Sequence, residues 1–316
     1  MANSNATVNA ALIAQSALTT LLAKFPVLSQ IATDFSGASV KFNQDIITHI
    51  VTPTVAQDFD PATGYVPDDQ AQVDVTVKID KHAYAGYAIT DVERSTSEID
   101  LNQRYADKVA YALGRKVSDD LFALVVNANF NNKTEVAEDA FGRDSVVDIS
   151  TKLNKRFVPD MGRFMFVNSD YYNALVKDEA LYKAYITPQA GSTVVTGIIP
   201  NVNGFTVIEY SALPENGERL VGLAGIREGL IMAARIPDVP ENTGDTVISV
   251  VTDPRTGLSI QVRDRYDGRL GRQEVSYTLM YGFAAGNKPV IERIIRPAGG
   301  GCSSVSIPSP KARAPH

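Results

Sequence analysis

Residues that most often carry catalysis or bind metal are scarce in this chain. Its 316 residues include one cysteine and three histidines, His49, His82 and His316. A single cysteine excludes a disulfide framework within the chain and is typical of a reducing compartment. Histidine is the commonest general base and metal ligand, so this composition argues against an enzyme. Cys302 lies in a Gly- and Ser-rich tail, which predicts an exposed, inert thiol.

Excess positive charge and long apolar runs are also missing. The 30 Lys and Arg side chains are outnumbered by 36 Asp and Glu, so the net charge at pH 7 is −6. Proteins that grip nucleic acid through phosphate contacts usually have a basic balance. No apolar run approaches the ~20 residues that a bilayer span needs, and the N-terminus lacks the basic start of a signal peptide. We therefore expect a soluble protein without a membrane partner.

Two partial motifs fail on spacing. Gly222, Gly225 and Gly229 do not have the G-x-G-x-x-G arrangement of a dinucleotide site. Asp58 and Asp60 lie in a loop, as calcium ligands do, but the closing bidentate glutamate is missing. We predict no catalytic residue, no metal site and no cofactor.

Residues 1–44 are poor in charge, with only Lys24, Asp34 and Lys41. Leucines recur there at roughly helical spacing, and Pro26 is expected to end that helix. An arm of this kind buries its apolar stripe on its own domain or on a partner. The leucines predicted to make intersubunit contacts are Leu12, Leu18, Leu21 and Leu22.

Two strand-like segments flank a loop of turn-forming residues. Residues 71–90 begin with alternating apolar and polar side chains, the period of a strand, and residues 45–56 also read as a strand. The loop between them, DFDPATGYVPDDQ, is rich in Asp, Pro and Gly. The pattern predicts a long hairpin with an acidic tip.

A long amphipathic helix is predicted over residues 96–128. Apolar residues recur there every three or four positions, and Ser95 and Glu98 have the spacing of a capping box. Beyond it, residues 145–235 alternate short helices and strands, including a helix capped by Ser169. Residues 245–296 read as antiparallel strands joined by tight turns.

Opposite charges collect on two predicted elements. Residues 57–80 carry six Asp against one Lys, and residues 255–272 carry five Arg against two Asp. One interpretation is that the acidic and the basic segment are two separate solvated faces. The other is that they contact each other, within one chain or between chains. The residues predicted to make intersubunit contacts are Asp58, Asp60, Asp68, Asp69, Arg263, Arg265, Arg269 and Arg272.

The order of these elements resembles the tailed-bacteriophage major capsid proteins with the Hong Kong 97-like fold. Three segments carry the resemblance: ERSTSEIDLNQRYADKVAYALGRKVSDDLFALVVN, LVGLAGIREGLIMAA, which looks like a strand and small helix, and EVSYTLMYGFAAGNKPVIERI. The resemblance implies an α+β fold. Its parts would be an N-terminal arm at 1–44, an extended hairpin or E-loop at 45–90, a spine helix and the start of the peripheral domain at 91–144, a mixed α/β axial domain at 145–240, β-rich peripheral-domain strands at 241–297 and a flexible tail at 298–316.

The resemblance also implies a self-assembling structural protein and not an enzyme. The expected function is an icosahedral shell of pentamers and hexamers that encloses packaged double-stranded DNA, with weak, non-specific contact to it. Portal and scaffolding proteins are implied partners, and the expected location is the virion capsid, assembled in the host cytoplasm. Two alternatives remain open: an encapsulin-like compartment shell, and an α/β enzyme whose catalytic carboxylates are not identifiable.

Overall fold

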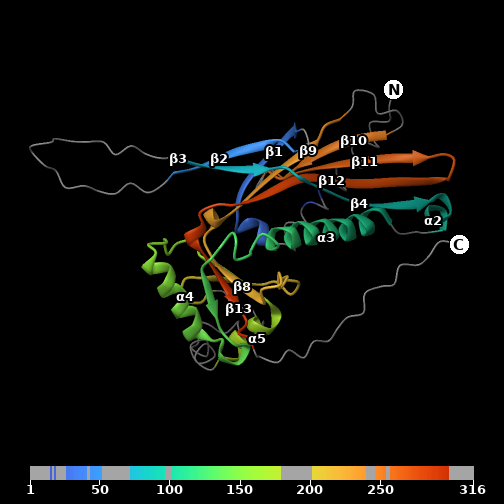
Figure 1. Ribbon diagram of the computed structural model, residues 1–316. Helices are drawn as coiled ribbons and strands as arrows, with labels where there is room; N and C mark the ends of the chain where they lie inside the picture. Colours follow the sequence, from blue (N-terminus) through green and yellow to red (C-terminus); the bar gives the residue numbers. More distant parts are fainter. Residues whose placement is uncertain are drawn as a thin grey trace, which may run out of the picture.

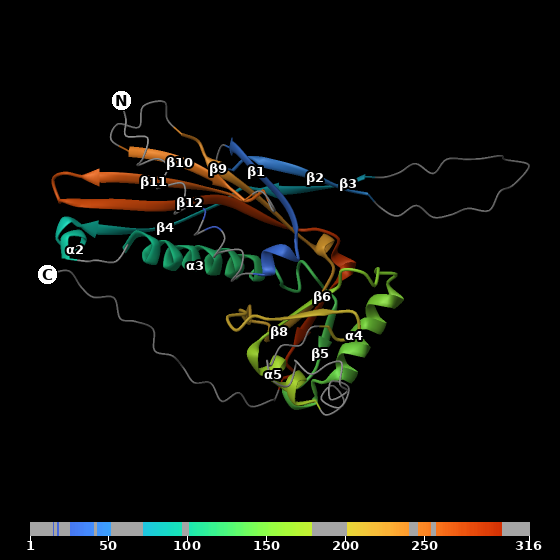
Figure 2. The ribbon, with the colours of Figure 1, turned by 180° about the vertical axis from the view of Figure 1, so that it is seen from behind.

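Two β-sheets and a two-stranded hairpin are arranged around one long helix (Figure 1). The computed structural model describes residues 15, 18, 26–40, 43–51, 72–96, 101–178, 201–239, 246–253 and 257–298. The long helix, α3 (Leu101–Phe122), runs along one face of the larger sheet and ends beside the smaller sheet (Figure 2). Among the described residues, no helix combines the length and apolarity that a bilayer crossing requires.

The larger sheet is organised by its longest strand, β12. Strand β4 pairs along one edge of β12, while β11 and then β9 pair along the other edge. Strand β1 extends the sheet by parallel pairing with β9, and β10 extends it by pairing with β11. The strands are β1 (Ala32–Val40), β4 (Lys81–Thr90), β9 (Leu230–Pro237), β10 (Thr246–Thr252), β11 (Ser259–Asp267) and β12 (Arg272–Ala285).

Side-chain alternation gives the larger sheet two unlike faces. Tyr277 and Tyr281 of β12 are buried on the face that α3 covers, where α3 contributes Leu113 and Val117. The alternate residues of β12, such as Ser276 and Met280, point to the opposite face, which we call the outer face. The helix thus covers one face of the sheet, and the outer face is covered only in part, where residues such as Met280 are buried.

The predicted helix over 96–128 is shorter than expected. Helix α2 (Asp91–Thr96) precedes α3 as a separate element, residues 97–100 lie outside the described residues, and turns follow Phe122. Ser95, predicted to begin a capping box with Glu98, lies inside α2, where its hydroxyl donates to the Asp91 carbonyl at 2.7 Å, while Glu98 lies outside the described residues. The reciprocal pair is Thr90 and Glu93, in which the Thr90 N–H donates to Glu93 at 2.9 Å and the Glu93 N–H donates to Thr90 at 3.3 Å.

The smaller sheet is the buried core of a second lobe. Its central strands β6, β8 and β13 are buried on both faces, as expected where helices cover a sheet. Helices α4 (Arg143–Lys155) and α5 (Ser169–Lys177) belong to this lobe. The cap of α5 is Asn168, which accepts from the Tyr171 N–H at 3.1 Å, and not Ser169. In spatial order the strands are β5 (Lys133–Glu135), β13 (Ile291–Ile295), β8 (Leu220–Gly225), β6 (Phe164–Val167) and β7 (Thr206–Glu209).

Two strands lie in a different sheet from the one that the expected domain boundaries imply. Strand β9 lies in the larger sheet, although 145–240 was expected to form one axial unit. Strand β13 lies in the smaller sheet, although it was grouped with the peripheral strands of 241–297. The segment LIMAA, grouped with a small helix, is β-strand after a short 3-10 turn at Arg227–Gly229. An apolar run of this length fits a buried strand as well as a helix.

The hairpin consists of β2 (Asp45–Val51) and β3 (Gln72–Lys78). The second predicted arm, 71–90, divides at Asp80, so that β3 belongs to the hairpin and β4 to the larger sheet. Val77 and Ile79 are fully buried against Met280 and its neighbours on the outer face. The base of the hairpin is therefore covered by its own chain.

Parts of the predicted arm and hairpin lie outside the described residues, namely Leu12, Leu21, Leu22 and the acidic tip with Asp58, Asp60, Asp68 and Asp69. Leu18 is buried in the main core of its own chain, at 2% exposure. Residues 32–40 of the expected arm form β1, an edge strand of the larger sheet.

Candidate functional site: assembly surfaces and the joint between the sheets

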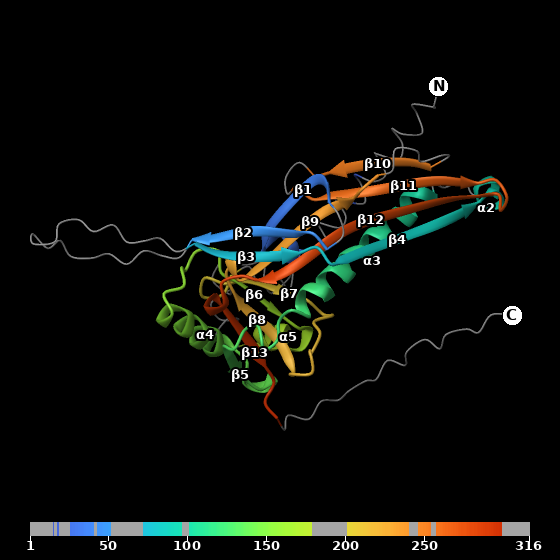
Figure 3. The same ribbon diagram turned by 45° about the horizontal axis from the view of Figure 1, so that its top comes forward.

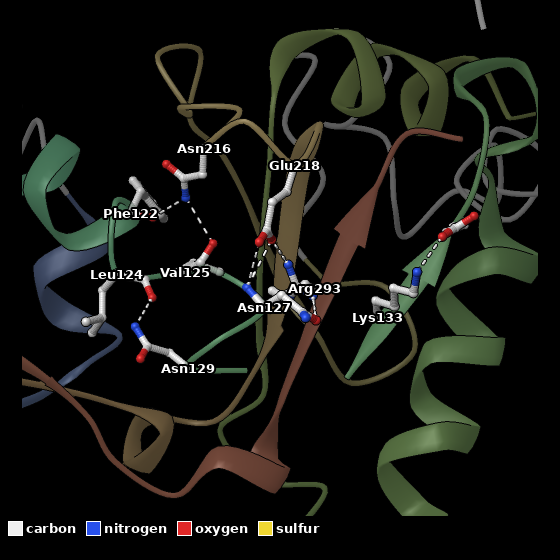
Figure 4. Close-up of polar contacts among 10 residues, drawn as sticks. Phe122, Leu124, Val125, Asn127, Asn129, Lys133, Asn216, Glu218 and Arg293 are labelled. Atoms are coloured by element: carbon white, nitrogen blue, oxygen red, sulfur yellow. Dashed lines mark hydrogen bonds and ion pairs between the residues drawn. The ribbon is translucent and has the colours of Figure 1, made fainter. Parts of the chain in front are cut away.

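A polar joint fixes the end of α3 to the smaller-sheet lobe (Figure 4). The Asn216 side-chain amide donates to the carbonyls of Phe122 at 2.8 Å and Val125 at 2.9 Å. Asn216 reaches this position from a tight turn, where its φ is +51°. The last carbonyls of a helix lack partners within the helix, so a side chain distant in sequence satisfies them here.

A buried ion pair forms the centre of the joint. Arg293 of β13 is 1% exposed and pairs with Glu218, whose carboxylate also accepts from the Asn127 N–H at 3.0 Å. The Arg293 guanidinium donates to the Asn127 side chain at 2.8 Å. A buried guanidinium is costly without such partners. The network therefore ties the segment after α3 to the middle of the smaller sheet.

Two neighbouring carboxylates tie the last turn of α3 to both sheets. The Tyr210 hydroxyl, just after β7, donates to Asp119 at 3.0 Å, and the Tyr281 hydroxyl of β12 donates to Asp120 at 2.6 Å. Burial raises the pKa of both tyrosines, and the paired carboxylates raise it further. Acids at a helix C-terminus oppose the helix dipole, so their position here is explained by these two contacts.

Asp120 is also a source of pH dependence. Burial alone would raise its pKa, but hydrogen bonds from Tyr281 and Lys116, together with the charges of Lys81 and Lys116, lower it. A carboxyl whose folded pKa is depressed adds stability above its unfolded pKa of about 3.9 and loses it as the pH falls through the folded pKa.

We therefore expect the stability difference between Asp120→Asn and the wild type to shrink as the pH falls from about 7 to about 3. Urea unfolding midpoints of the unassembled chain measure it. Asp148→Asn removes an exposed carboxylate from α4 and is the matched control. A difference between Asp120→Asn and the wild type that stays constant over this range would contradict the assignment.

Three of the four predicted arginines share the outer face. Arg263 and Arg265 of β11 lie opposite Ser276 and Glu274 of β12, and Arg272 forms an ion pair with Glu274 at 2.5 Å. Arg269 is exposed in the turn between β11 and β12. The structure thus brings Arg263, Arg265 and Arg272 together, whereas their predicted acidic partners lie outside the described residues.

Other exposed side chains extend this face beyond the arginines. Tyr84 of β4 is 77% exposed and Val250 of β10 is 43% exposed. His82 of β4 bonds Thr278 at 2.7 Å, and burial followed by the charge of Arg263 lowers its pKa. In the part of the chain that the structure describes, no group of three His, Cys, Asp or Glu side chains is placed to hold a metal ion.

A loop after α4 exposes two apolar side chains that no pattern in the sequence predicted. Phe157 is 94% exposed and Met161 is 89% exposed. Buried Arg163 holds the loop from inside by donating to the carbonyls of Pro159 at 2.9 Å and Val158 at 2.5 Å. Phe157 has a φ of +58°, which bulky residues rarely adopt.

Comparisons with solved structures agree with this fold. The structure of Mycobacterium phage Che8 is 16% identical with a TM-score of 0.53, covering 80% of this chain and 85% of that one. The capsid of cyanophage P-SCSP1u is 11% identical with a TM-score of 0.57, covering 84% and 86%. A virus-like particle from Pyrococcus furiosus is 10% identical with a TM-score of 0.51, covering 89% and 96%. At these identities the matches show the fold alone, which is the expected α+β, Hong Kong 97-like fold.

The family itself is shown by sequence. No curated protein matches the chain. The family described as phage capsid protein matches residues 72–292, which span β3 through the start of β13 and include the long helix α3, the joint apart from Arg293, and most of both sheets. The chain therefore belongs to the phage capsid protein family and is a major capsid protein, a subunit of an icosahedral shell.

Proposed function

We propose that copies of this chain associate through the outer face, the hairpin and the 157–161 loop to enclose double-stranded DNA. The role is structural, without catalysis, and the shell is built in the host cytoplasm with portal and scaffolding proteins as partners. Pentamers and hexamers are the expected units. The family supports self-association, and the geometry of the hairpin carries the proposed contacts.

The hairpin leaves the larger sheet at the end opposite the turn between β11 and β12 (Figure 3), and the outer-face arginines lie on these two strands towards that turn. Strands β3 and β4 follow one another roughly in line, and β4 residue Gly86 lies opposite Ser276, the register row of Arg263. From Gln72 to Gly86 is therefore about 46 Å at ~3.3 Å per residue.

The acidic residues of the tip cannot span this distance within one chain. Asp69 is three residues from Gln72, a reach of about 10 Å, and Asp58 is seven residues from Val51, a reach of about 23 Å. The outer-face arginines of the same chain are much farther away. Pairing between the acidic tip and these arginines therefore requires two chains, which supports an intersubunit contact.

The 157–161 loop is a second proposed contact, and Phe157→Gly tests it. A bulky residue in the left-handed region costs about 1–2 kcal/mol, which glycine avoids. We expect the unassembled variant to be as stable as the wild type or more so, while assembling into fewer shells because an apolar contact is lost. Urea unfolding measures the stability of the unassembled chain, and sedimentation measures the yield of shells. Wild-type shell yield from Phe157→Gly would exclude the loop from the interface.

Negative-stain microscopy and nuclease protection test the proposed function as a whole. The full-length chain should form closed shells, and particles from infected cells should hold nuclease-resistant DNA. Closed shells that hold protein cargo and no DNA would instead support a compartment, which the similarity to a virus-like particle keeps within this fold. Compact monomers under all assembly conditions would reject both.

A further inference from the structure

The exposed side of α3 carries a row of positive charge. Arg104, Lys108, Tyr111 and Arg115 are separated by four, three and four residues, so they lie on one side of the helix. All four are exposed, Tyr111 at 48%. We call these four residues the α3 stripe. It is a local exception in a chain whose net charge is −6.

Acidic residues on this helix lie away from the stripe or beside its end. Asp107 and Asp120 are half-buried towards the sheets, and Asp119 is 3.7 Å from Arg115 while it also accepts from Tyr210. No described carboxylate lies within ion-pair distance of Arg104 or Lys108. A solvated helix gains from alternating charges at i,i+4, whereas Arg104 and Lys108 repel each other at that spacing.

The stripe lies on the side of the molecule opposite the outer face. Helix α3 covers one face of the larger sheet, and the hairpin base packs on the other, so the two surfaces point in opposite directions (Figure 2). In a closed shell, a sheet lobe presents one such side to the contents. The contents in the proposed function are double-stranded DNA, which carries one negative charge per ~1.7 Å of its axis.

We propose that the α3 stripe is the surface of the subunit that faces the lumen and contacts the phosphate backbone of the enclosed DNA. This inference rests on the proposed function. Arg104 and Arg115 are about 16 Å apart along the helix, which matches about five base pairs of one strand at ~3.4 Å each. Arg, Lys and Tyr all make phosphate contacts without reading sequence. Such contact is weak and non-specific, as a container requires.

The test uses the full-length, unassembled chain and a labelled duplex of about 30 base pairs, with fluorescence anisotropy at about 50–200 mM salt. The stripe variant is Arg104→Gln with Lys108→Gln and Arg115→Gln, and glutamine keeps helix propensity. The control removes the same charge from the smaller-sheet lobe with Arg143→Gln, Lys155→Gln and Lys177→Gln, all exposed on α4 and α5. We expect the stripe variant to lower the slope of log affinity against log salt by up to about 2.7, and the control to leave it near the wild-type value.

Equal DNA binding by the stripe variant, the control and the wild type would overturn the inference. If the stripe variant binds DNA like the wild type but fails to form shells, the stripe contacts another protein surface, such as an acidic one. Negative-stain images of the same preparations separate this inference from the proposed function. Wild-type chain without shells contradicts the proposed function, whereas normal shells combined with unchanged DNA binding contradict the stripe alone.

Discussion

Glu218→Ala is expected to lower the free energy of unfolding by about 3 kcal/mol, the low end for breaking a buried ion pair. The reason is that Arg293 is 1% exposed and would keep its charge without its carboxylate partner. The Asn127 N–H would lose its acceptor in the same step. The low end applies because the Glu218 side chain is 33% exposed and water can partly replace it. Urea unfolding of the unassembled chain measures the change.

Two further variants make this result specific. Glu218→Leu with Arg293→Met removes both charges and should destabilise less than Glu218→Ala alone, because no buried charge is left unpaired. Glu135→Ala breaks the exposed pair with Lys133 on the neighbouring strand and should change stability little. If Glu218→Ala proved as stable as Glu135→Ala, the joint would not depend on this ion pair.

Reversing the acidic tip should cause the largest loss of assembly. Asp68→Arg with Asp69→Arg would place two positive charges against the outer-face arginines of a neighbouring chain. Like charges in contact suppress an interface strongly, although each exposed opposite-charge pair contributes only ~0.2–1 kcal/mol. We expect few or no shells from this double variant, measured by sedimentation and negative-stain microscopy.

Compensation provides the control for the charge reversal. Arg263→Asp with Arg265→Asp should impair assembly alone and partly restore it in combination with the reversed tip. Arg272 is left unchanged because it already pairs with Glu274 of its own chain. Normal shells from the reversed tip at both low and high salt would show that the tip does not meet these arginines.

The local periodicity of apolar side chains was enough to predict the regular strands and helices. The antiparallel strands predicted over 245–296 include β12, where Val275, Tyr277 and Tyr281 alternate, and the strands predicted over 145–235 include β6, an apolar run at Phe164–Val167. The resemblance to the capsid family predicted the order of the parts. These signals suffice because burial of a strand or helix face follows the period of its own side chains.

The sequence could not predict contacts made by side chains distant along the chain. Helical spacing continues through Leu124, but Asn216, about ninety residues later, takes the carbonyls at which α3 ends. Arg293 follows Glu292 in β13, and only the fold shows that Glu218 pairs with Arg293 while Glu292 pairs with Arg156. The exposure of Phe157 depends on Arg163 filling the loop from inside. In each case a tertiary partner overrides the local pattern.

The passage of the chain between the sheets has a consequence for proteolysis. Among the described elements, the chain leaves the larger sheet through α3, returns between β8 and β9, and leaves again between β12 and β13. The two lobes are therefore joined by three covalent connections, and no single cut can release one from the other. A nicked subunit should keep its place in the shell and lose a lobe only after all three connections are severed.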